Sequence, residues 1–243
     1  MFKFIKVLFL ILTLVSLLYG REEKRSMLNI LIITGGHDFE ASFYEIFDSF
    51  EHIQYDTISQ PEANQAMMFN QVGKYDVLVF YDMWQHITEQ EKVGFLNLLE
   101  KGRGIVFLHH SLASYQNWAE YKNIIGGKYV LKESDDQVSA GSTYKHDLIL
   151  HVKIADTTHA VTDGLKDFQI KDEGYKGIEI LPSVQPLLTV SHTDCAEYVA
   201  WAHKYQNSKI VYILLGHDHH AYQEESYRKL IQNAIFWVAG KSI

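Results

Sequence analysis

The sequence predicts an α/β domain in which a mostly parallel sheet carries helices on both faces. Short apolar runs alternate with helical patterns along the chain, as in folds built from strand–helix–strand units. The runs at residues 29–34 and 77–81 are apolar without alternation, which is typical of strands buried on both faces. No internal repeat, low-complexity tract or linker divides the chain, so we expect a single domain over residues 21–243.

The first half of the chain contains the clearest helix signals. The expected elements are, in order, a strand at 29–34, a helix at 39–52, strands at 54–58 and 77–81, a helix from Thr88, a strand at 105–108 and a helix at 114–125. Apolar side chains at helical spacing support the helix at 39–52. Thr88 and Glu91 match a capping box, which satisfies free backbone N–H groups, and Gly102 ends that helix.

The second half is richer in strands. The expected elements are strands at 148–154, 185–190, 198–203 and 209–215, followed by a closing helix at 226–239. The strand at 209–215 has the strongest signal of these four.

The N-terminus predicts export. Lys3 and Lys6 precede an apolar run at 7–18, which is too short to span a membrane and is followed by a polar junction. This pattern is typical of a secretory signal peptide, here residues 1–20, with cleavage expected after Gly20. We therefore expect a periplasmic or extracellular protein without stable membrane insertion once the signal is removed.

Charge and cysteine content narrow the classes of partner. The formal net charge is −8, and loss of Lys3 and Lys6 makes it −10. An acidic chain without basic runs argues against nucleic-acid binding. Cys195 is the only cysteine, so the domain has no internal disulfide and must be stable in an oxidising compartment through packing alone.

Polar side chains follow the ends of several predicted strands. In an open parallel sheet these carboxyl ends meet at one edge, where ligands bind. The residues delivered there are His37 and Asp38, Trp84 and His86, His109 and His110, and His217, His219 and His220. Histidine acts as acid, base or metal ligand near neutral pH, so the group predicts an organised site. Any single member is equally well explained as a loop histidine facing solvent.

A second cluster contains Asp172, Glu173 and Tyr175. It could be a solvated acidic turn or a source of site carboxylates. Histidine with glutamate could hold a metal with an open position for water or substrate, although no His-Glu-x-x-His motif occurs. Of His109 and His110 we expect only one to face the pocket, because adjacent residues leaving a strand point to opposite sides.

Several familiar enzyme motifs are missing from the sequence. It contains no Gly-x-Gly-x-x-Gly, no phosphate-binding Gly-x-x-x-x-Gly-Lys-Ser/Thr and no Gly-x-Ser-x-Gly elbow. Gly35 and Gly36 are therefore interpreted as a tight turn, and Cys195 as a structural residue.

Six short motifs are spread over the chain: TGGHD at 34–38, FLHH at 107–110, THAVTDGL at 158–165, DEGY at 172–175, LGHD at 215–218 and AIFWVAG at 234–240. In their order and spacing they resemble the ThuA-like (trehalose-utilisation) family. The resemblance covers roughly residues 28–241. It implies a flavodoxin-like fold, similar to class I glutamine amidotransferases, with a mostly parallel sheet and helices on both faces.

The resemblance also implies a function in sugar catabolism, including trehalose and 3-keto-sugars. The amidotransferases carry a cysteine at a strand-to-helix elbow, but the matching residues 108–111 contain none, so that mechanism lacks its nucleophile. His217 lies where the amidotransferase histidine would be expected. We therefore expect an enzyme that processes glycosides or 3-keto-glycosides by histidine and glutamate acid–base chemistry.

The predicted site follows from these two lines of reasoning. The catalytic candidates are His37, His109, Glu173 and His217; the substrate-binding candidates are Asp38, Trp84, His110, Asp172 and Tyr175; and the candidates for holding a divalent metal such as zinc are His109, Glu173 and His217. The expected partner is a small carbohydrate. The sequence is compatible with both a monomer and a homo-oligomer. Two alternatives stand beside the enzyme: a non-catalytic carbohydrate-binding protein of the cell envelope, and a metal-dependent hydrolase with an unrelated substrate.

Overall fold

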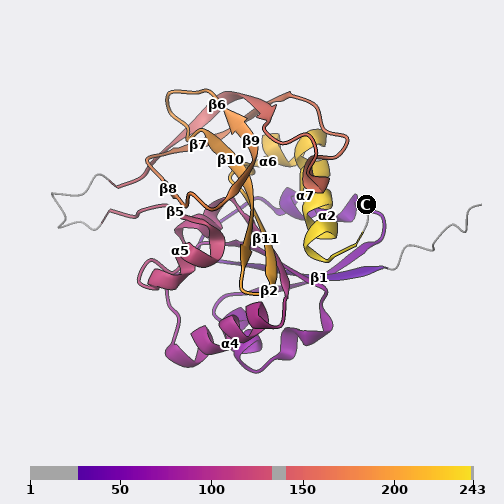
Figure 1. Ribbon diagram of the computed structural model, residues 1–243, viewed down its shortest axis with the longest axis vertical. Helices are drawn as coiled ribbons and strands as arrows, with labels where there is room; N and C mark the ends of the chain where they lie inside the picture. The colour runs from indigo at the N-terminus through magenta and orange to yellow at the C-terminus, as the bar shows by residue number, and fades with distance from the viewer. Residues whose placement is uncertain (1–26, 133–140, 242–243) are drawn as a thin grey trace, which may run out of the picture.

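The structure is a computed structural model that describes residues 27–132 and 141–241 (Figure 1). The predicted signal peptide at 1–20 lies outside these residues. Within them, no helix is both long and apolar enough to cross a membrane.

One large sheet runs through the described part of the chain, with its strands in the order β2-β1-β3-β4-β11-β10-β9-β6-β7. The strands are β1 (Leu28–Gly35), β2 (Ile53–Ser59), β3 (Val77–Asp82), β4 (Gly104–Leu108), β6 (Thr143–Ile154), β7 (Phe168–Lys176), β9 (Gln185–Val190), β10 (Tyr198–Tyr205) and β11 (Ser208–Ile213). A separate short pair joins β5 (Gly127–Lys128) to β8 (Glu179–Ile180).

The sheet has a parallel half and an antiparallel half. Strands β2-β1-β3-β4-β11 all pair in parallel, in the 2-1-3-4-5 order of flavodoxin-like folds. The pairings from β11 through β10, β9 and β6 to β7 are antiparallel. Four successive reversals bring β7 back to the direction of β11, so both strands present their carboxyl ends at the same edge.

Helices cover both faces of the sheet, as predicted. In Figure 1, α2 (Tyr44–Asp48), α6 (His219–Tyr222) and α7 (Glu225–Val238) lie on one side, while α4 (Glu89–Glu100) and α5 (Ala119–Ile125) lie on the other. Helix α3 (Glu62–Met68) packs against α4. Four 3-10 helices complete the described elements: η1 (Ala41–Phe43), η2 (Gln71–Lys74), η3 (His109–Ala113) and η4 (Ala160–Thr162).

The local predictions hold where the sequence signal is strongest. In α4 the Thr88 hydroxyl accepts from the Glu91 N–H at 3.3 Å, and the Glu91 carboxylate accepts from the Thr88 N–H at 2.7 Å. The strand at 185–190 is found at the predicted bounds.

Two predicted helices are shorter than expected. The helix at 39–52 is reduced to η1 and α2, which ends at Asp48; His52, whose φ of 64° is incompatible with a right-handed helix, then leads the chain into β2. The helix at 114–125 begins only at Ala119, because Tyr115 has a φ of 48°.

Candidate functional site

A cavity of about 440 Å³ lies at the edge of the sheet where β1, β3, β4, β7 and β11 end. Its lining residues are His37, Met83, His110, Ala113, Tyr129, Leu131, Tyr144, His146, Glu173, Tyr175 and His217. Five of these eleven residues are histidine or glutamate, and the others form apolar and aromatic walls. A few polar groups in an otherwise apolar cavity are typical of a site for a small molecule.

The most buried element of this site is a pair formed by His109 and Glu173. The His109 side chain is fully buried; its Nδ1 contacts the carbonyl oxygen of Leu214, and its Nε2 lies 3.0 Å from Glu173 Oε2. A carbonyl oxygen can only accept, so Nδ1 is the donor there. The carboxylate on the other side makes the Nε2 contact a charge-assisted hydrogen bond.

Glu173 remains an anion in this setting. Burial raises the pKa of its carboxyl, but the hydrogen bond from His109 and the charges of His109, His217 and His146 outweigh burial, so that the pKa lies below its usual value. The Glu173 side chain, which is only 4% exposed, therefore places a negative charge in the site.

Two further histidines approach the same carboxylate from the cavity. His146 Nδ1 lies 3.2 Å from Glu173 Oε1, and His217 Nδ1 lies 3.5 Å from Glu173 Oε2. The rings of His146 and His217 are 4.6 Å apart between centroids. His146, Glu173 and His217 each offer one atom that could bind a metal, and these three atoms all lie within 4.8 Å of one another.

A break in the strand register brings His146 into the site. The pairing of β6 with β7 shifts between Lys145 and Leu148, and Asp147 within the break has a φ of 59°. Such a bulge adds local twist and redirects a side chain. His146 thereby faces Glu173 on the neighbouring strand.

Asp172 fixes the loop that carries His217. Its buried carboxylate accepts hydrogen bonds from the backbone N–H groups of Gly216 at 2.7 Å, His217 at 3.0 Å and Glu173 at 2.8 Å. Burial raises the pKa of Asp172 to about 6, against the opposing effects of His109 and these N–H groups. Asp172 is absent from the cavity lining, and its hydrogen bonds are those of a positioning residue; direct contact with substrate stays a prediction.

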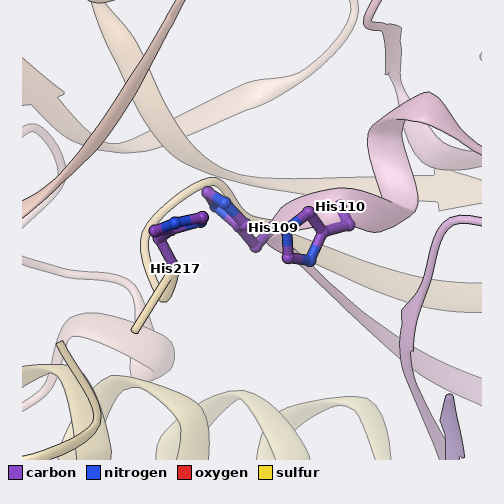
Figure 2. A group of neighbouring side chains, drawn as sticks. All are labelled: His109, His110 and His217. Carbon is purple, nitrogen blue, oxygen red and sulfur yellow. The ribbon is translucent and has the colours of Figure 1, made fainter. Parts of the chain in front are cut away.

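Figure 2 shows His109 lying between His110 and His217. His110 lines the cavity and is 4% exposed, and its ring stacks on His37 with centroids 3.9 Å apart. Among the described residues, neither His110 Nε2 nor His217 Nδ1 has a hydrogen-bond partner. Burial, followed by the neighbouring histidines, holds the pKa of His110 well below its usual value, so this ring is neutral.

The strand-to-helix elbow carries a histidine. β4 ends at Leu108 and η3 begins at His109, whose φ of 42° lies in the strained left-handed region. Hydrolases of the Gly-x-Ser-x-Gly type hold their nucleophile at such a turn. Both ring nitrogens of His109 are engaged, and Cys195 lies outside the cavity with its pKa raised to about 12 by burial. The geometry thus offers no amidotransferase nucleophile.

The structure brings most of the predicted residues together, but two lie elsewhere. Asp38 is exposed, and Trp84 is half-buried in the loop after β3, where its backbone oxygen accepts from Tyr115; neither lines the cavity. Tyr175 lines the cavity and stacks on His109 with centroids 4.8 Å apart.

Sequence reasoning missed several lining residues, of which His146 is the most important. One signal was present: Lys145, His146 and Asp147 are three consecutive polar residues at the start of a strand whose following residues, 148–150, are all apolar. Such an interruption is typical of a bulge. Tyr129, Leu131 and Tyr144 gave no comparable signal, because aromatic and aliphatic residues usually indicate packing.

Fold and site together define a flavodoxin-like α/β protein with a histidine-rich cavity at the carboxyl edge of its sheet. The family model described as "ThuA: Trehalose utilisation" matches residues 29–238. The chain therefore belongs to the ThuA family. A search of curated protein sequences finds no match.

Solved structures agree with this fold. A putative ThuA-like protein from Parabacteroides merdae superposes with a TM-score of 0.72 at 20% identity, covering 88% of this chain and 91% of that one. A second putative ThuA-like protein, from Bacteroides uniformis, gives 0.67 at 18% identity, with 90% and 94% covered. A cytoplasmic protein from Salmonella typhimurium LT2 gives 0.62 at 11% identity, with 87% and 99% covered.

Proposed function

We propose that the protein is an exported carbohydrate-processing enzyme that acts on glycosides carrying a ketone at carbon 3. The observation that carries the proposal is the Glu173 carboxylate, held from behind by buried His109 and faced from the cavity by His146 and His217. The family's description as trehalose utilisation supports a sugar substrate. The export part rests on the signal pattern at residues 1–20.

The chemistry needs a base and a polar group near the ketone. A ketone at carbon 3 acidifies the hydrogen on carbon 2. A base removes that proton, the electron pair of the C–H bond forms an enolate with the ketone, and the enolate expels the group on carbon 1. A double bond then joins carbons 1 and 2, and the departing oxygen takes a proton from an acid or water.

The cavity offers groups for each of these roles. His110 is our candidate base, because it lines the cavity and its Nε2 has no hydrogen-bond partner among the described residues. His146, half-exposed and paired with Glu173, is placed to donate to the enolate oxygen. Tyr129 and Tyr175 both line the cavity, with their rings inclined at 69° and 4.9 Å apart between centroids, and they offer aromatic surface against which a sugar ring packs.

The proposal is tested by measuring release of the carbon-1 group from a panel of 3-keto-glucosides, beside their unoxidised parents. We expect turnover of the keto forms alone. His110→Ala should lower kcat by about 10²- to 10⁴-fold, the usual contribution of a general base. The matched control is His151→Ala, which removes an exposed histidine outside the cavity and should leave kcat unchanged.

A second candidate function, a non-catalytic carbohydrate-binding protein, uses the same cavity and aromatic wall. Saccharide binding without turnover of any keto-glucoside would favour it and overturn the enzyme proposal. Equal loss of activity in His110→Ala and His151→Ala would remove His110 from the mechanism.

A further inference from the structure

We infer that His146, Glu173 and His217 form a binding site for one divalent transition-metal ion, such as zinc. The inference deepens the proposed function, on which its substrate part rests, since the ion would take the place of the His146 N–H as the group that holds the substrate's ketone oxygen. The site itself rests on geometry that is independent of any substrate.

The spacing of the three side chains fits a single ion. With metal–ligand bonds of about 2.0–2.1 Å, two ligands in tetrahedral geometry lie about 3.4 Å apart. His146 Nδ1 and His217 Nδ1 lie 3.2 Å and 3.5 Å from the Glu173 oxygens that they face. The three ligand atoms come from β6, β7 and the loop after β11, so the fold itself brings them together.

A buried histidine nitrogen without a hydrogen-bond partner supports the presence of a metal ion between these three side chains. His217 Nδ1 is buried and, within the described residues, makes no hydrogen bond, although it lies 3.5 Å from a carboxylate oxygen. Buried polar atoms of this kind are uncommon and call for a partner. Across the cavity, His110 is also buried with an unpartnered Nε2, and it offers an atom within 4.8 Å of a His217 nitrogen.

The donor set selects the class of metal. Two imidazoles and one carboxylate suit zinc and its transition-metal neighbours, whereas magnesium and calcium prefer oxygen ligands alone. Three protein ligands beside a cavity leave positions open for water or substrate, as in catalytic sites. The ketone oxygen and the neighbouring hydroxyl of a 3-keto-sugar are suited to those positions.

Supporting hydrogen bonds around the three residues also match a metal site. Ligating carboxylates are usually fixed by a second hydrogen bond, and Glu173 receives one from His109 Nε2 at 3.0 Å. Asp172 fixes the backbone of His217 in the same way. His109, which we had named as a metal candidate, has both ring nitrogens engaged, so His146 takes its place in the ligand set.

The test is direct metal binding by the mature protein, purified after expression of the full chain. The protein is stripped with chelator and titrated with Zn²⁺ by calorimetry, and with Co²⁺ by its visible absorption. We expect one ion per chain and Co²⁺ bands typical of a mixed nitrogen and oxygen site. His146→Ala should lower affinity by at least about 100-fold, and His151→Ala, on the same strand, should bind as the wild type does.

His146 is half-exposed, so its removal should leave the fold intact, and a circular dichroism melt checks this. Absence of stoichiometric binding, or equal binding by the His146→Ala and His151→Ala variants, would overturn the site. Metal binding without turnover of keto-glucosides would keep the site and remove the enzyme proposal. Turnover that survives complete metal removal would keep the enzyme and remove the metal from its mechanism.

Discussion

Replacing Asp82 by asparagine should change how the stability of this protein depends on pH. Asp82 ends β3, and its carboxyl is fully buried, where it accepts hydrogen bonds from Gln60 Nε2 at 3.1 Å and Ser114 Oγ at 3.3 Å. Burial raises the pKa of this carboxyl from 3.8 to about 7, against the smaller opposing effect of those hydrogen bonds. The carboxyl is therefore neutral in the folded protein at pH values where it is ionised in the unfolded chain.

The sign and size of the effect follow from proton linkage. Between pH 3.8 and about 7 the folded state holds one proton more than the unfolded state at this residue, so its contribution to stability falls as pH rises. The contribution is complete below pH 3.8 and is lost once the pH passes the folded pKa. The two pKa values differ by about 3, which corresponds to about 4 kcal/mol.

Urea unfolding of the wild type and Asp82→Asn at several pH values between 4 and 8 measures this effect. Asparagine keeps an acceptor oxygen but does not titrate. We expect the wild type to lose about 3 to 4 kcal/mol relative to the variant across this range. Other titrating groups, such as Asp172, contribute to both proteins and cancel in the difference. A difference that stays flat, or that favours the wild type as pH rises, would refute the reasoning.

Two further predictions concern the backbone near the site and a helix end. Gly36 has a φ of 82°, and an added Cβ would collide with the backbone oxygen of Met83, so Gly36→Ala should lower the free energy of unfolding by about 1–3 kcal/mol and weaken ligand binding. Gly240→Ala is its control, because Gly240 has a φ of 68° but no atom within 4 Å of the added Cβ. Thr88→Ala should cost about 1 kcal/mol in urea unfolding through loss of the α4 cap and leave keto-glucoside turnover unchanged; a loss of turnover would contradict this assignment.

From the sequence, candidate residues could be placed together where a general rule of sheet topology applies. Parallel strands bring their carboxyl ends to one edge, so His37 after β1, His110 after β4 and His217 after β11 could be placed together before any contact was known. The capping box and the doubly buried strands were predictable for a different reason, because each depends on residues close in sequence.

The rest of the site depends on long-range contacts that the sequence does not reveal. His146 reaches the cavity because the register of β6 against β7 shifts at a bulge. Trp84 follows a strand end just as His37 does, yet it lies outside the cavity lining. The direction of a loop residue is set by tertiary packing, and strand-end counting could not separate these two cases.

For the adjacent acids Asp172 and Glu173, only the structure reveals which of the two faces the cavity. Successive side chains of a strand point to opposite faces, so only one of two neighbours on β7 can meet the cavity directly. Glu173 takes that position, while Asp172 accepts the backbone N–H groups of Gly216 and His217. One dipeptide therefore supplies the carboxylate of the site and also fixes the loop whose histidine faces that carboxylate. The distance between Glu173 and His217 is thus set by two neighbouring residues of one strand, which explains how a cavity built from distant segments can hold its polar groups at fixed spacing.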